Sequence, residues 1–133
     1  RMKGPKKMGL ISDCIVAGGM GDGSYRLGML DVSVKDGIAR TDSGSLAGST
    51  LTLEKAVANL IGLADIPPLE AVHMASLRPA EFLGVSESLG SIALHKRACL
   101  TVVDDDFQVQ ATIIDGQLVH HNPSIYSRFS ELY

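Results

Sequence analysis

The feature that most limits how this chain can fold is one continuous apolar run, "MGLISDCIV", at residues 8–16. Such a run is typical of a strand buried on both faces, as in a parallel sheet, although a buried helix gives the same pattern. The glycine-rich stretch "AGGMGDG" at residues 17–23 then ends any regular structure. A parallel strand needs neighbours to satisfy its backbone groups. We therefore expect the chain to be a fragment of a larger α/β protein.

The middle of the chain predicts a hairpin and three helices. Leu30, Val32 and Val34 alternate with polar residues, and the turn signal Asp36-Gly37 completes a β-hairpin at 29–41. Apolar residues at helical spacing predict helices within 52–84. Pro79 is expected to end the second helix and open the third, and Gly84 to stop the third.

From residue 90 the pattern predicts strands, at 98–103, 108–114 and 117–120, with Asp115-Gly116 as a second hairpin turn. The acidic run 104–106 is read as a turn rather than a calcium site, because it lacks the spacing of an EF-hand loop. The expected organisation is a part with helices at 1–89, a β part at 90–120 and a tail at 121–133.

Composition excludes several classes of protein. The chain has 133 residues and a net charge of −3, which argues for one domain and against a nucleic-acid binder. We find no signal peptide and no apolar run long enough to span a membrane, and expect a cytoplasmic protein. Cys14 and Cys99 lie in apolar runs and are interpreted as small free hydrophobes, with a disulfide as the open alternative.

Several motifs occur in an order that resembles a known family. They are Ser12-Asp13-Cys14, the glycine loop, "YRLG", Leu46-Ala47-Gly48-Ser49, "MASLRPAEFLGV" and "LGSIALHKRACLTVVDDDFQVQATIIDGQLV". Together, over residues 1–119, they resemble the final barrel segment of N-acetylglucosamine-6-phosphate deacetylases, which belong to the amidohydrolase superfamily. The chain departs from the family at His95, at Cys99, and at Cys14, where the family usually has alanine.

The resemblance implies a (β/α)₈ TIM barrel with a small β-sandwich domain. A complete barrel takes about 250 residues. This chain would therefore supply strand 8 of the barrel, the helices after it and the C-terminal strands of the sandwich.

The resemblance also implies a chemistry for Asp13. Barrel active sites lie at the C-terminal ends of the strands, where this residue would stand. Asp13 would take a proton from a metal-bound water and pass it to the leaving amine, so that N-acetylglucosamine 6-phosphate gives glucosamine 6-phosphate and acetate. From the residues alone, an aspartate that caps the following loop is the commoner case.

The same resemblance assigns the turn Leu46, Ala47 and Gly48 to substrate binding, through exposed backbone groups. Without the resemblance, an ordinary loop before a helix is the better interpretation, although Gly48 permits close backbone approach. The loop at 18–23 lacks the phosphate-binding motifs of nucleotide sites. It is interpreted as a flexible loop, with a lid as the functional alternative.

No metal ligand is assigned in this chain. The histidines His73, His95, His120 and His121 lack the spacing of a metal site. The divalent ion that the family implies, with Zn²⁺ as the expected identity, would take its ligands from elsewhere in a full-length enzyme. The chain alone is therefore expected to be inactive.

Two other functions stay open. One is a different amidohydrolase, such as a dihydroorotase- or hydantoinase-like cyclic amidase. The other is a non-catalytic α+β interaction module. The expected partner is a small amino-sugar phosphate, with no nucleic acid and no membrane, and the resemblance implies a homodimeric full-length enzyme.

Overall fold

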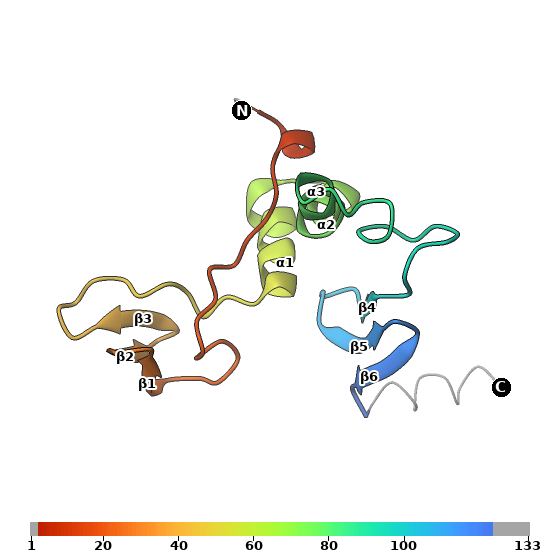
Figure 1. The fold of residues 1–133 in the computed structure, drawn as a ribbon. Coiled ribbons are helices and arrows are strands. Elements are labelled where there is room, and N and C mark those ends of the chain that lie inside the picture. Colours follow the sequence, from red (N-terminus) through yellow and green to blue (C-terminus); the bar gives the residue numbers. More distant parts are fainter. Residues whose placement is uncertain (1–2, 124–133) are drawn as a thin grey trace. The chain divides into compact units, whose positions relative to one another are not determined.

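The computed structural model describes residues 3–123, which fall into two compact units (Figure 1). One unit spans residues 10–56, and the other combines the residues before 10 with those from 57 onward. Each unit contains one three-stranded antiparallel sheet. The chain is therefore an α/β protein with two small antiparallel sheets.

The sheet of the 10–56 unit is a meander of strands β1 (Gly23–Leu27), β2 (Leu30–Lys35) and β3 (Ile38–Thr41). Lys35 pairs with Ile38, so Asp36 and Gly37 form a two-residue turn. Both have positive φ, 52° and 73°, which Asp-Gly tolerates better than most pairs. The predicted hairpin is confirmed, whereas β1 was missed.

The core of this unit lies on one face of the sheet. Val32 and Val34 of β2 point to that face while their neighbours are exposed, as a period of two requires. The side chains of Ile15, Tyr25 and Leu27 pack against the buried cluster. The cluster consists of Ala17, Val32, Val34, Ala39 and Ala47.

The strand predicted for residues 8–16 is wrong. The segment is extended but forms only an isolated parallel bridge, between Cys14 and Ser49. The Ile11 side chain is 82% exposed, so the segment is not buried either. A β-strand is stabilised by backbone hydrogen bonds to a neighbouring strand. Residues 3–123 give this run only one bridge partner, Ser49, and no neighbouring strand.

Three helices follow, as predicted: α1 (Leu53–Ala64), α2 (Pro68–Ala75) and α3 (Leu77–Phe82). The position expected for Pro79 is wrong, because α2 ends before Ser76 and Pro79 lies inside the first turn of α3. Proline is tolerated there, since the N–H groups of a first turn have no partner within the helix. Gly84 follows α3 with φ 69°, the left-handed conformation expected of a helix stop.

The second sheet comprises β4 (Leu100–Val103), β5 (Val109–Ile114) and β6 (Gln117–His121). All three strands were predicted, as was the turn at Asp115-Gly116, where φ is 49° and 81°. Residues 90–97 form turns and coil rather than strand. The acidic run is a turn, in which the Asp104 carboxylate accepts hydrogen bonds from the backbone N–H groups of Asp106 and Gln108.

Three further features concern the chain as a whole. A 3₁₀ turn at Pro5–Lys7 precedes the segment that carries Asp13. No helix within residues 3–123 is long and apolar enough to cross a membrane. Cys14 and Cys99 are both free, as interpreted, but exposed rather than packed. Of the predicted tail, residues 124–133 lie outside the described residues.

Candidate functional site

Asp13 lies in the extended segment, with its carboxylate exposed and its backbone in the left-handed region at φ 50°. Residues with a side chain rarely adopt this conformation, and aspartate is among the few that tolerate it. Within residues 3–123 the carboxylate accepts no hydrogen bond. The described residues therefore do not show Asp13 capping the following loop.

The backbone around Asp13 is tied to the turn before α1. Ser49 donates from its N–H to the Asp13 carbonyl at 2.9 Å and accepts from the Ile15 N–H at 2.9 Å. The Ser49 hydroxyl also donates to the Ser12 carbonyl. Asp13 and the turn, thirty or more residues apart in sequence, thus meet at one place.

Gly48 lies directly against Asp13. Its φ is 77°, and a Cβ at this position would lie 2.7 Å from the Ile15 Cγ2 and 3.0 Å from the Asp13 carbonyl oxygen. The same point lies 3.6 Å from the Asp13 Oδ2. Glycine at this position thus permits a close approach between the turn and the Asp13 backbone, whereas its close approach to a sugar stays a prediction.

The other two turn residues differ from each other. Ala47 is buried in the core, and its N–H donates to the Ala39 carbonyl at 3.0 Å. Leu46 is 69% exposed. In the described part of the chain, the Gly48 N–H and the Ala47 carbonyl have no hydrogen-bond partner. Substrate binding by Leu46, Ala47 and Gly48 stays a prediction, but two backbone groups beside Asp13 are available for it.

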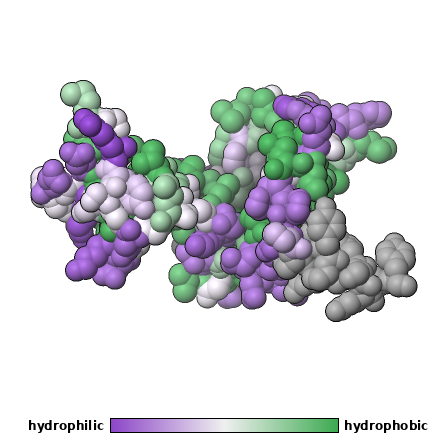
Figure 2. Space-filling model, turned by 90° about the horizontal axis from the view of Figure 1, so that it is seen from below, coloured by the Kyte–Doolittle hydropathy of each residue, from purple (hydrophilic) through white to green (hydrophobic). Residues whose placement is uncertain are grey.

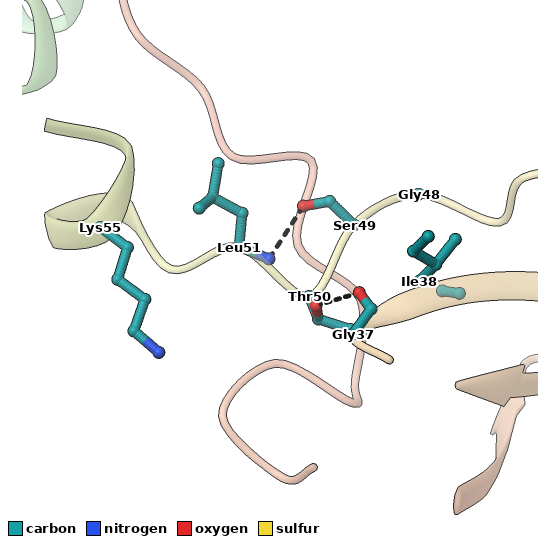
Figure 3. A pocket seen from close by; sticks show the side chains of 8 residues that line it. Gly37, Ile38, Gly48, Ser49, Thr50, Leu51 and Lys55 are labelled. Carbon is teal, nitrogen blue, oxygen red and sulfur yellow. Dashed lines mark hydrogen bonds between the residues drawn. The ribbon is translucent and has the colours of Figure 1, made fainter. Parts of the chain in front are cut away.

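A shallow open pocket of about 400 Å³ flanks the same turn (Figure 3). Its wall includes Gly48 but not Asp13, and Lys55 in the first turn of α1 adds a cationic side chain. Thr50 closes one side by donating from its hydroxyl to the Gly37 carbonyl at 2.7 Å. The lining residues are Gly37, Ile38, Ala39, Gly48, Ser49, Thr50, Leu51 and Lys55.

The end of the glycine loop is hydrogen-bonded to the β2–β3 turn of the sheet. Asp22 accepts hydrogen bonds from the N–H groups of Asp36, at 2.8 Å, and Gly37, at 3.1 Å. These bonds hold the pKa of Asp22 below its usual value. The Tyr25 hydroxyl donates to the carbonyls of Gly21, at 2.8 Å, and Met20. Residues 20–22 are thus anchored, which argues against the whole loop acting as a lid.

Sequence reasoning did not single out Ser49, Thr50 or Asp22 as parts of this arrangement. Ser49 and Thr50 precede α1, and their hydroxyls donate to the carbonyls of Ser12 and Gly37, respectively. A serine, threonine or aspartate beside a glycine turn is a local signal for such bonds. The signal does not reveal that the partners lie in other segments.

Cys14 follows Asp13 and restricts another glycine. Its sulfur lies 2.1 Å from where a Cβ on Gly18 would stand, so this thiol occupies the space that any side chain at residue 18 would need. The thiol contacts the Ile15 carbonyl at 3.5 Å. Cys14 therefore packs against the glycine loop at Gly18.

The histidines all belong to the unit that does not contain Asp13. His73 is half-buried on α2, and His120 and His121 are exposed on β6. Across residues 3–123, no three histidine, cysteine or acidic side chains come together in a group that could hold a metal ion.

Comparison with known proteins gives a consistent result. The Amidohydrolase family model matches residues 26–119. The putative N-acetylgalactosamine-6-phosphate deacetylase of Escherichia coli K12 is 48% identical over 109 residues, covering 82% of this chain and 65% of that protein. The N-acetylglucosamine-6-phosphate deacetylase of Vibrio furnissii is 44% identical over 113 residues, covering 85% of this chain and 28% of that protein.

A solved structure agrees with these relatives. The N-acetylglucosamine-6-phosphate deacetylase from Pasteurella multocida matches with a TM-score of 0.82 at 32% identity, covering 88% of this chain and 31% of that one. The resemblance found in the sequence is confirmed. The chain spans less than two thirds of the length of each of these proteins.

Proposed function

Because the chain belongs to the amidohydrolase family, we propose that it forms the C-terminal part of a hydrolase that deacetylates an N-acetylamino-sugar 6-phosphate. The relatives named above support this substrate class and favour it over a cyclic amide. They differ in the sugar, galactosamine in one and glucosamine in the other. The proposal therefore includes both epimers.

In this proposal the apolar run at residues 8–16, which forms no strand within residues 3–123, becomes strand 8 of a (β/α)₈ barrel when the other barrel strands are present, and residues 90–120 belong to a small β-sandwich. The parallel bridge between Cys14 and Ser49 supports strand pairing at Cys14. The unpaired backbone of the run would pair with a neighbouring barrel strand. The homodimer that the resemblance implied and the cytoplasmic location expected from the sequence remain predictions.

Asp13 carries the chemistry that we assign to this chain. Its carboxylate takes a proton from the attacking water and then gives it to the nitrogen that leaves as the free amine. The observation that carries this assignment is an exposed carboxylate without a hydrogen bond, held in left-handed backbone beside Gly48. Non-glycine residues in such conformations concentrate at functional sites. The free Gly48 N–H and Ala47 carbonyl would orient the sugar.

The divalent ion implied by the resemblance, expected to be Zn²⁺, does not fit residues 3–123 by themselves, since no three suitable ligands meet there. No step is assigned to it here. We expect the 133-residue chain alone to release no acetate when Zn²⁺ and substrate are supplied. Turnover close to that of an intact deacetylase would contradict this expectation.

A chimera tests the function. Residues 1–119 of this chain replace the matching segment of the Vibrio furnissii enzyme, and acetate release is measured with both sugar phosphates. We expect activity with at least one sugar. Asp13→Asn should lower kcat by about 100-fold or more, the usual size of a general acid–base contribution.

Asp105→Asn is the matched control, because Asp105 is an exposed aspartate on the β4–β5 turn of the other unit. Full activity of the D13N chimera would overturn the role of Asp13. A folded chimera that hydrolyses neither sugar would overturn the proposed function.

A further inference from the structure

We propose that Ser49 is the positioning residue that holds the Asp13 carboxylate in its reactive orientation. This inference rests on the function proposed above, and it assigns to Ser49 a role distinct from substrate binding. The residue directly follows Gly48, but its own polar atoms are directed to protein groups rather than left free.

Ser49 binds the backbone on both sides of Asp13. Its N–H donates to the Asp13 carbonyl and its carbonyl accepts from the Ile15 N–H, both at 2.9 Å. Its hydroxyl donates to the Ser12 carbonyl. One residue thus fixes the peptide groups that determine where the Cα–Cβ bond of Asp13 points.

The Ser49 hydroxyl is itself held by two hydrogen bonds. While the hydroxyl donates to Ser12, its oxygen accepts from the Leu51 N–H at 3.1 Å (Figure 3). Ser49 is half-buried, which shields these bonds from competing water. The hydroxyl therefore joins the Asp13 segment to the chain that enters α1.

This fixing matters because no hydrogen bond within residues 3–123 orients the Asp13 carboxylate directly. Its carboxylate accepts no hydrogen bond there, and its φ of 50° persists only if neighbours hold the backbone. A proton acceptor must lie within hydrogen-bond reach of the group it serves. A displacement of about 1 Å can lower a rate by about 100-fold.

The first test measures the fixing itself in the 133-residue chain, by hydrogen exchange at the amides of residues 15 and 49. Ser49→Ala removes the hydroxyl, and both amides should exchange about tenfold faster, the effect of losing one hydrogen bond. Ser49→Thr keeps the hydroxyl and should restore protection. Ser45→Ala, on the same turn, is the matched control, since its hydroxyl contacts only Ser43 at 3.4 Å. Unchanged exchange in S49A would overturn the inference.

The second test measures catalysis in the chimera. S49A should lower kcat by about 10- to 100-fold while KM changes by less than about twofold, because the acid is misplaced but the sugar contacts remain. S49T should recover most of kcat, and S45A should match the parent. A rise in KM alone would identify Ser49 as a substrate contact and overturn positioning.

The two proposals fail in different ways. An inactive parent chimera would overturn the function and, with it, the role of Ser49. An active parent in which S49A and S45A have equal kcat would overturn the role of Ser49 alone.

Discussion

Gly48 has almost no room on the side that faces Asp13. Any side chain there would meet the Ile15 methyl group and the Asp13 carbonyl, and its left-handed φ of 77° adds backbone strain. Gly44 has a similar φ of 83° but no atom near its Cβ position within 4 Å. Comparing substitutions at the two glycines therefore separates the free-energy cost of a left-handed backbone from the cost of close contact.

We expect Gly48→Ala to destabilise the 10–56 unit by about 2–4 kcal/mol, since strain and overpacking add. Gly44→Ala should cost about 1–2 kcal/mol, from strain alone. Urea unfolding followed by circular dichroism measures both. An equal decrease in the free energy of unfolding in the two variants would show that the close contact at Gly48 does not affect stability.

Among single elements, the β2–β3 turn depends on a residue outside the hairpin. The Asp22 carboxylate accepts from both turn N–H groups, those of Asp36 and Gly37. These bonds favour the charged carboxylate and lower its pKa below the usual 3.8. Asp22 is exposed, so the effect is moderated by solvent but keeps its sign.

The sign follows from linkage. With a folded-state pKa below the unfolded value, Asp22 contributes stability above the unfolded value, and that stability is lost as pH falls through the folded pKa. In urea unfolding between about pH 6 and about pH 2, wild type should lose this contribution and Asp22→Asn should lack it throughout. Asp31→Asn, an exposed aspartate on β2, should follow wild type. Parallel curves for wild type and D22N would contradict the role of Asp22.

The elements that depend on local signals were predictable. Asp-Gly at 36–37 and 115–116 placed both hairpin turns, and helical spacing placed α1. β1 was missed because its sequence "GSYRL" begins with glycine and its alternation of polar and apolar residues covers only four positions. Its strand character comes from pairing with β2, in which Tyr25 lies opposite Val32. For the segment around Asp13, a strand was predicted but none is formed. Its apolar residues are typical of a strand between two neighbours, and residues 3–123 do not supply those neighbours.

The candidate site was predictable only through family resemblance. That resemblance named Asp13 and Gly48, and the structure brings them together. Ser49 and Asp22 act across 37 and 14 residues of sequence, respectively. Hydrogen bonds between residues so far apart in sequence leave no periodic pattern in it, so patterns of neighbouring residues could not predict them.

At the scale of the whole molecule, the interior is built from small side chains. Among residues 3–123, Val32 is the largest side chain that is fully buried, and most of the other core residues are alanines. Many large apolar side chains lie at the surface instead (Figure 2). Met29 is 93% exposed, Ile92 88% and Leu94 89%. Buried area drives folding at about 25 cal/mol per Å², so much of the available driving force is unused within this chain.

We therefore expect the 133-residue chain to self-associate. Sedimentation velocity should show species larger than a monomer, with a proportion that rises with concentration. A monomer at every concentration, combined with one sharp cooperative melt, would contradict this expectation. Substituting Met29, Ile92 and Leu94 together by glutamine should reduce association, whereas Ser24→Gln on β1 should not.

The sulfur of Cys14 has a consequence for how this site can change over time. It occupies the space of a Cβ on Gly18, so a larger residue at 18 first requires the thiol to rotate away or disappear. Alanine at 14 would vacate that space. A side chain at residue 18 is therefore compatible with Cys14 only in a different thiol rotamer, whereas with alanine at 14 it needs no such rotation.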